Sequence, residues 1–213
     1  MAWEDCLEEP DLDPAFLERD RLRKAGRPVE IARTDRLLLR ETILSDVPKL
    51  YEMGGASGSK AYLRPVQPTL EKELEVMEAY IRFAYAFYDF GLWTVLERES
   101  GEIVGRAGLF LSELLPEGVE LGYLIRKDRR QRGYAWECCQ AILAYASKVL
   151  EMETVHVLTD RNNEPSIRLA RKLGFTEQGR IRPVTISGHC VGTEALEAQE
   201  WVHFTLIFCA DMI

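Results

Sequence analysis

A short run of basic residues is the first place where this chain could do chemistry, by binding an anion. Five of the seven residues from Arg126 to Arg132 are Lys or Arg, although the formal net charge of the chain is −8. The run lies between a predicted strand and a predicted helix, and Gly133 and Ala135 stand where the helix begins. Small residues there let backbone N–H groups approach an anion, and the helix dipole adds positive potential. The pattern predicts a pyrophosphate site, with an ordinary solvated loop as the alternative.

Four segments in register carry a resemblance to a known family. The segment RQRGYA at 130–135 resembles the R/Q-x-x-G-x-G/A loop with which GNAT acetyltransferases hold the pyrophosphate of acetyl-CoA. Three more segments look like the ribosomal-protein-alanine N-acetyltransferase branch of that family: TDRLLLR at 34–40, ELGY at 120–123, and NEPS at 163–166 followed by KLGF at 172–175. The resemblance covers roughly residues 34–180. It implies a single-domain GNAT fold in which two central strands splay apart.

The resemblance also implies where acetyl-CoA would bind. Backbone groups of Leu124, Ile125 and Arg126 are expected to pair with the pantetheine chain, much as an added strand would. Asn163 is expected both to cap a helix and to touch the cofactor. Arg126, Arg129 and Arg132 are candidates for further phosphate contacts. The residues whose amides are expected to surround the pyrophosphate are Arg130, Gln131, Arg132, Gly133, Tyr134, Ala135 and Trp136.

Two side chains are candidates for moving protons between an amine and a thioester. An amine must lose a proton to attack, and Glu120 resembles the family's carboxylate at this strand position. A solvent-facing or salt-bridged glutamate is the alternative for Glu120. Many GNAT enzymes protonate the leaving thiolate with a tyrosine, but the corresponding position here is Ala170. Ser166 is expected to serve instead, with helix capping as its alternative, and the N–H of Ile125 is the expected oxyanion donor.

The elements that must position these residues follow from hydrophobic periodicity and from turn residues. Their predicted order is β-α-α-β-β-β-α-β-α-β-β, in which three successive strands lead into a βαβ crossover. This order implies an α/β (α+β) fold: a mixed, mostly antiparallel twisted sheet of about seven strands with helices on both faces. A long helix from about Leu70 to Phe90 carries two apolar stripes, one through Met77 and one through Phe83 and Phe87. Most of both stripes is expected to be core, with the lining of a substrate groove as the alternative for the surplus aromatics.

Composition limits the class of protein and its partners. A chain of 213 residues suits one globular domain. The N-terminus is acidic, unlike a secretory signal, and no apolar run approaches the ~20 residues of a membrane span. Five cysteines without C-x-x-C spacing suggest neither a disulfide framework nor a zinc site. We therefore expect a cytoplasmic protein that binds neither nucleic acid nor a membrane, as a monomer or homodimer. Its partners, as the resemblance implies them, are acetyl-CoA and an amine.

Residues 1–30 differ from the rest because they are rich in charge and are punctuated by three prolines. They are expected to form an N-terminal extension with a short helix from Asp13 to Ala25, followed by a GNAT domain over 31–213. A loosely packed extension is the simpler interpretation. A partner-binding or dimer-swapping arm is the alternative.

The function expected from these features is transfer of an acetyl group to a protein N-terminus or a small amine by direct attack in a ternary complex. The alternative is an acyl-CoA-binding regulatory module with little or no turnover, which the absence of a tyrosine at position 170 favours. The loops at 54–68 and 186–200 are expected to select the amine. The second loop contains Glu194, Glu197 and Glu200, which suit a cationic substrate or a solvated loop equally well.

Overall fold

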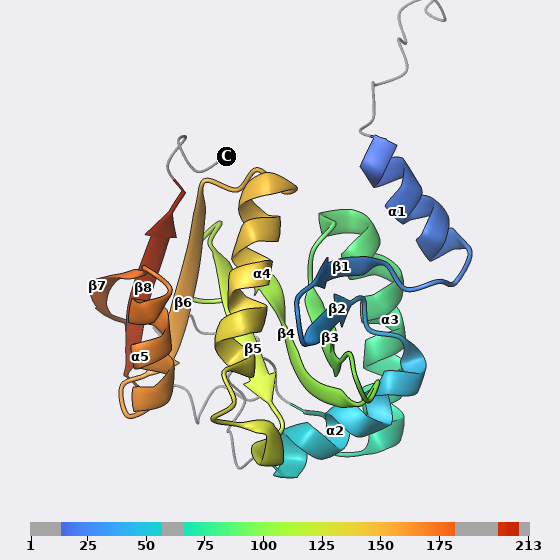
Figure 1. Ribbon diagram of the computed structural model, residues 1–213, viewed down its shortest axis with the longest axis horizontal. Coiled ribbons are helices and arrows are strands. Elements are labelled where there is room, and N and C mark those ends of the chain that lie inside the picture. The colour runs from blue at the N-terminus through green and yellow to red at the C-terminus, as the bar shows by residue number, and fades with distance from the viewer. Residues whose placement is uncertain (1–13, 57–65, 182–199, 209–213) are drawn as a thin grey trace, which may run out of the picture.

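The computed structural model describes residues 14–56, 66–181 and 200–208 (Figure 1). Its strands form one sheet in the order β1-β2-β3-β4-β5-β6-β8-β7, and neighbours are antiparallel except for the parallel pair β5–β6. The strands are β1 Glu30–Arg33, β2 Leu37–Arg40, β3 Leu92–Glu97, β4 Ile103–Leu111, β5 Val119–Ile125, β6 Thr154–Asp160, β7 Thr176–Ile181 and β8 Trp201–Ile207. The expected mixed, mostly antiparallel sheet is confirmed.

The described sheet has eight strands where about seven were predicted. The difference lies in the segment around residues 30–40, which was predicted as a single strand and is in fact a hairpin of β1 and β2. Thr34 closes the turn of this hairpin, because its N–H donates to the carbonyl of Leu37 at 2.9 Å. The first strand of the hairpin is short, with four residues and one irregularity in its register.

Helices cover both faces of the sheet, as expected (Figure 1). Helices α4 and α5 lie on one face, and α2 and α3 pack against the other, where Met77 of α3 contacts Arg106 of β4 at 3.5 Å. None of the helices in the described part of the chain combines the length and apolar character that a bilayer crossing requires. The helices are α1 Pro14–Lys24, α2 Val47–Ala56, α3 Leu70–Tyr88, α4 Tyr134–Lys148 and α5 Glu164–Lys172, with short 3-10 turns at Leu44–Asp46 and Lys127–Arg129.

The splay between the two central strands is also present. Strands β4 and β5 pair along seven residues, whereas β5 and β6 share the single register pair Glu120 and His156. Beyond Glu120 the two parallel strands therefore part, and their facing backbone groups are not bonded to each other. This gap between β5 and β6 is where the fold opens.

Helix α3 differs from its prediction in which residues it buries. Met77 of the first stripe is buried, but Phe83 and Phe87 of the second stripe are 62% and 79% exposed. The prediction that most of both stripes is core is therefore wrong for the second. The buried face of the helix includes Tyr85 instead. Its hydroxyl accepts a hydrogen bond from the N–H of Thr42 and donates one to the carbonyl of Leu92. Only one layer of helices covers this face, so Phe83 and Phe87 on the outer side of α3 remain exposed.

The N-terminal helix α1 buries none of its residues but is tied to the domain by charge. The Nε of Arg23 donates to Glu41 at 2.8 Å, and its Nη2 donates to Asp89 at 2.7 Å. Arg19 also binds Asp89 through its Nε at 3.1 Å. The extension is thus anchored through α1, while the predicted cap Asp13 lies outside the described residues.

Candidate active site

A cleft of about 1360 Å³ opens where β5 and β6 part. Residues from β5, β6 and the starts of α4 and α5 line one part of it, and residues from α2, α3 and β4 line the other. All the site residues selected from the sequence line this cleft except Arg126 and Arg132. The structure therefore brings most of the predicted constellation into one space.

The loop before α4 has the shape of an anion site. Gly133 is the N-cap of α4 with φ of 81°, and Gln131 also has a positive φ of 60°. The first helical bond runs from the N–H of Glu137 to the carbonyl of Gly133 at 3.0 Å, so the amides of the preceding helical residues have no intrahelical partner. Unused amides at a helix start, beside left-handed turns, form a concave site for phosphate oxygens. The residues present thus fit a pyrophosphate.

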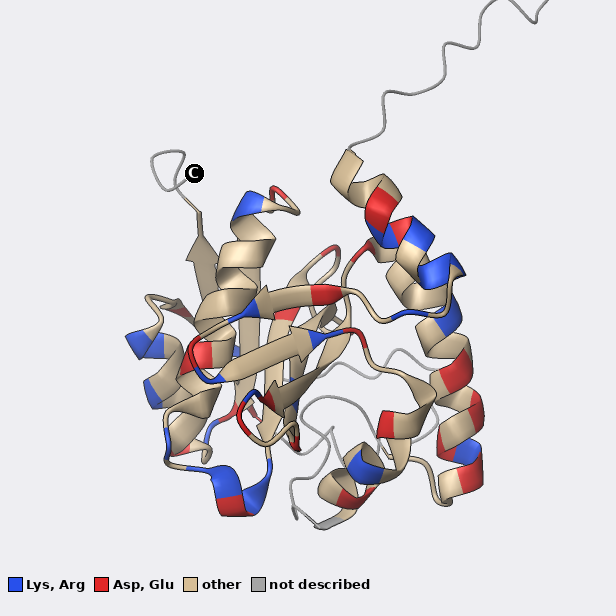
Figure 2. Cartoon of the chain, turned by 45° about the vertical axis from the view of Figure 1, so that its right-hand side comes forward, with Lys and Arg blue, Asp and Glu red and all other residues tan. Residues whose placement is uncertain are grey.

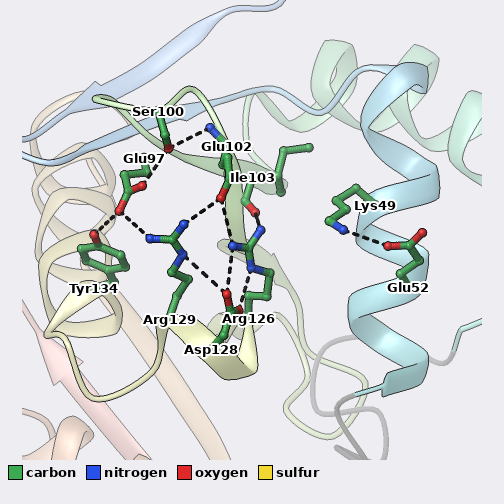
Figure 3. Close-up of polar contacts among 10 residues, drawn as sticks. All are labelled: Lys49, Glu52, Glu97, Ser100, Glu102, Ile103, Arg126, Asp128, Arg129 and Tyr134. Atoms are coloured by element: carbon green, nitrogen blue, oxygen red, sulfur yellow. Dashed lines mark hydrogen bonds and ion pairs between the residues drawn. The ribbon is translucent and has the colours of Figure 1, made fainter.

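Two arginines of the basic run have their charge engaged by carboxylates of the chain, although Arg129 still lines the cleft. Arg126 binds Asp128 through Nε at 2.7 Å and Glu102 through Nη2 at 3.0 Å, and Arg129 binds Glu102 at 2.7 Å and Glu97 at 3.3 Å (Figure 3). These ion pairs brace the basic loop against the hairpin of β3 and β4. Figure 2 shows the loop as a blue segment at the lower edge of a molecule whose charges are otherwise mixed.

Two further arginines bring positive charge to the cleft. Arg130 lines the cleft, and its Nε donates to the carbonyl of Ile125 at 2.9 Å. Arg168 of α5 also lines the cleft, and the sequence analysis did not select it. Its position on the exposed side of an amphipathic helix resembles that of any surface arginine, so no local signal distinguished it.

The backbone of β5 offers its groups alternately to β4 and to the opening. The N–H of Arg126 donates to the carbonyl of Val104 at 2.8 Å. In an antiparallel pair, residues bonded to the neighbour alternate with residues whose groups point the other way, so Leu124 also bonds β4. The backbone groups of Tyr123 and Ile125 point to the opening instead. Of the three residues expected to offer backbone groups to the opening, only Ile125 does so, because Leu124 and Arg126 bond β4. Tyr123 offers its backbone groups there as well.

Glu120 is buried beside the cleft, with 8% of its surface exposed. It pairs in register with Phe110 of β4 and so shares the face of α2 and α3. Burial raises the pKa of its carboxyl to about 7, which a hydrogen bond with Ser112 opposes and the nearby charge of Glu113 reinforces. The solvent-facing alternative for this residue does not hold. A carboxyl with this pKa is suited to accept a proton at neutral pH.

Ser166 faces the cleft from α5 and meets a tyrosine. Its Oγ lies 2.8 Å from the Oη of Tyr123, and its N–H donates to the Oδ1 of Asn163 at 3.3 Å. Asn163 is thus the N-cap of α5, as predicted, whereas the Ser166 hydroxyl is engaged with a side chain. Burial raises the pKa of Tyr123, so its phenol stays protonated. Strand β5 thus places a phenol hydroxyl beside Ser166 in the cleft.

Glu120 and the hydroxyl pair lie on opposite faces of the sheet. Tyr123 is three residues after Glu120 on β5, and an odd spacing along a strand places side chains on opposite faces. Both line the same cleft because β6 has moved away from β5 between them. A carboxyl and a pair of hydroxyls therefore face one opening from its two sides.

Part of the predicted amine-selecting region lies outside the described residues, including Glu194 and Glu197. Glu200 is described, and its carboxylate binds Arg161 at 3.2 Å and Arg180 at 3.0 Å. Its charge is thus shared with two cations of the chain. Gly54 and Gly55, expected in the first loop, belong instead to the last turn of α2.

Comparisons with known proteins agree with this arrangement. Residues 36–176 match the model of the Acetyltransferase (GNAT) domain. The chain is 24% identical over 155 residues to the Uncharacterized N-acetyltransferase YoaA of Bacillus subtilis (strain 168), covering 71% of this chain and 86% of that protein. It is 30% identical over 96 residues to the Uncharacterized protein YkkB of the same organism, covering 45% of this chain and 56% of YkkB.

A solved structure shares the fold at low sequence identity. RimL, a ribosomal L7/L12 alpha-N-protein acetyltransferase in complex with coenzyme A, superposes with a TM-score of 0.66 at 15% identity, covering 84% of this chain and 98% of RimL. The family match spans well over half of the sequence and includes the basic loop, Glu120 and Ser166. The chain is therefore an N-acetyltransferase of the GNAT family.

Proposed function

We propose that the protein binds acetyl-CoA along β5 and the loop before α4, and transfers the acetyl group to a primary amine by direct attack in a ternary complex. The observation that carries this proposal is the cleft at the β5–β6 gap, which joins an anion-binding loop, a buried carboxyl and a hydroxyl pair. GNAT acetyltransferases use acetyl-CoA, and RimL was solved with coenzyme A.

The loop and strand would hold the acetyl donor. The amides of Tyr134, Ala135 and Trp136 suit the pyrophosphate, with Arg130 adding charge. The backbone groups of Tyr123 and Ile125 would pair with the amide groups of the pantetheine chain. The N–H of Ile125 would also stabilise negative charge on the thioester oxygen as it develops.

Proton transfer would run from one face of the sheet to the other. Acetyl-CoA supplies an acetyl carbon to which the amine nitrogen bonds as the carbon–sulfur bond breaks. Glu120, with a pKa of about 7, would take the proton that the amine loses. The Ser166 and Tyr123 pair would give a proton to the sulfur from the opposite face. Tyr123 removes the reason to prefer a regulatory module without turnover.

On the described amine side of the cleft, Leu50, Met53 and Phe110 lie beside the carboxyls of Glu120 and Glu73 and the guanidinium of Arg106. The two carboxyls suit a cationic amine, and the apolar walls suit an apolar group attached to it. The α-amino group of a protein, on which RimL acts by its printed name, is thus the first substrate class to test.

Calorimetric titration with acetyl-CoA, with NAD and ATP as controls, tests the donor site. We expect binding of acetyl-CoA alone. Acetyl transfer is then tested with a panel of amines that contains N-terminal peptides, polyamines and aminoglycosides. Release of the coenzyme A thiol measures the reaction. The Glu120→Gln variant should bind acetyl-CoA like the parent and release little thiol. Absence of acetyl-CoA binding by the parent protein would contradict the assignment of the donor site.

A further inference from the structure

Arg36, in the turn that joins β1 to β2, reaches the loop before α4 although it does not line the cleft. Its Nη1 donates to the carbonyl of Arg132 at 2.9 Å. Its Nε donates to Glu137 of α4 at 2.7 Å, and its backbone N–H donates to the same carboxylate at 3.1 Å. Its guanidinium also lies 4.7 Å from the centre of the Tyr134 ring. One side chain thus contacts the loop and the first turn of the helix together.

Glu137 is the anchor for this arginine. Its side chain is only 14% exposed and accepts from the hydroxyl of Thr34 at 2.5 Å as well as from Arg36. Burial opposes its charged form, but the hydrogen bonds from Thr34 and Arg36 outweigh burial and lower its pKa. A charged, multiply bonded carboxylate holds a guanidinium in a fixed orientation. The hairpin turn is therefore locked to the start of α4.

The loop has a conformation that needs such a contact. Gln131 and Gly133, on either side of Arg132, both have left-handed φ angles, and non-glycine residues rarely adopt them. In a trans peptide the carbonyl and the following N–H point in opposite directions. Holding the Arg132 carbonyl against Arg36 therefore turns the N–H of Gly133 away from Arg36. Gly133 itself lines the cleft, so this peptide sets the shape of the anion site.

We propose that Arg36, through Arg132 and Glu137, is a positioning residue that keeps the loop in its pyrophosphate-binding shape. This inference rests on the proposed acetyl-CoA site. Its consequence is specific, because the contact acts on the pyrophosphate end of the donor and not on the thioester. Loss of Arg36 should weaken the binding of acetyl donors that carry a pyrophosphate and should not affect the binding of donors that lack one.

The test compares acetyl-CoA with S-acetylpantetheine, which lacks the pyrophosphate, in the Arg36→Ala and Glu137→Gln variants. We expect the KM for acetyl-CoA to rise about tenfold with little change in kcat, because the loop is misplaced and the chemistry is not. The kcat/KM for S-acetylpantetheine should stay within about twofold of the parent. Arg36→Lys should recover only part of the loss, since an ammonium cannot bridge both acceptors in a plane.

Arg33→Ala is the matched control. Arg33 lies on the same hairpin and forms an exposed ion pair with Glu30 at 2.7 Å. This ion pair does not involve the loop before α4. Arg33→Ala should leave both donors unaffected. The role of Arg36 is overturned if the KM for acetyl-CoA is unchanged in Arg36→Ala and Glu137→Gln. It is also overturned if both variants lose kcat/KM equally with the two donors. Neither result would contradict the donor site itself. A parent protein that binds no acetyl-CoA overturns the donor site, and the role of Arg36 with it.

Discussion

The hydroxyl of Tyr123 lies 2.8 Å from that of Ser166, although 43 residues separate them in the chain. Tyr123 lies near the end of strand β5, and Ser166 lies in the first turn of helix α5. The two elements flank the gap between β5 and β6, so the pair forms only when the crossover through α4 and β6 is complete. Each hydroxyl is neutral at physiological pH, and the shared bond gives the cleft a proton that can move toward the leaving sulfur.

We predict that Tyr123→Phe and Ser166→Ala each lower kcat about tenfold, a modest loss because a thiolate leaves more readily than most groups. The KM for acetyl-CoA should stay within about twofold, since neither hydroxyl contacts the anion loop. Because the pair acts as a unit, the double variant should be no slower than the worse single variant. Steady-state kinetics would show this, with Tyr88→Phe, an exposed tyrosine on α3, as control. Full activity in both single variants would exclude the pair from proton transfer.

The pKa of Glu120 predicts the pH dependence of catalysis. The carboxylate must be ionised to accept a proton, and its pKa is about 7. Below that value kcat/KM should fall about tenfold per pH unit, and above it the rate should level off. Glu120→Gln should remove this inflection and lower the rate at pH 8. A parent profile that is flat from pH 6 to 8 would mean that another group, or none, takes the proton.

The same carboxyl predicts a pH-dependent stability difference. Its pKa is raised on folding, so folding favours the protonated form, and ionisation destabilises the native state as pH rises from the unfolded value of 4.5 toward about 7. Glu120→Gln should therefore be more stable than the parent by about 1–3 kcal/mol at pH 8. At pH 4.5 and below the difference should vanish. Urea titrations at the two pH values measure this difference in the free energy of unfolding. An equal difference at both pH values would contradict the burial of the Glu120 charge.

The ion pairs of α1 predict that the N-terminal helix contributes to stability. Asp89 binds Arg19 and Arg23, and its side chain is 14% exposed. Asp89→Asn keeps a residue that tolerates the left-handed helix end but removes the negative charge that both arginines bind, so that Arg23 keeps only Glu41 of its two charge partners. We expect a loss of about 2–3 kcal/mol in the free energy of unfolding. Asp20→Asn removes an exposed pair with Lys24 and should change it by less than about 0.5 kcal/mol. Similar losses in both variants would mean that α1 is not specifically anchored.

The features that local sequence signals predicted are those that depend on neighbouring residues. The start of α3 at Leu70 and the N-cap at Asn163 each follow from the residue type at one turn. The anion loop was predicted for the same reason, because its glycine and its basic residues are consecutive. The family motifs extended these predictions to the splayed sheet, since four segments in order specify one topology.

Tertiary structure decided which partners each residue meets. Sequence could not tell that Arg126 and Arg129 bind Glu97 and Glu102, because those carboxylates come from a different hairpin. It also could not assign Phe83 and Phe87 to solvent, since both stripes of α3 are apolar and only the number of covering layers distinguishes them. Likewise only the tertiary structure brings Tyr123 of β5 to Ser166 of α5. A contact between distant segments depends on how strands align and part, and no periodicity within one segment carries that information.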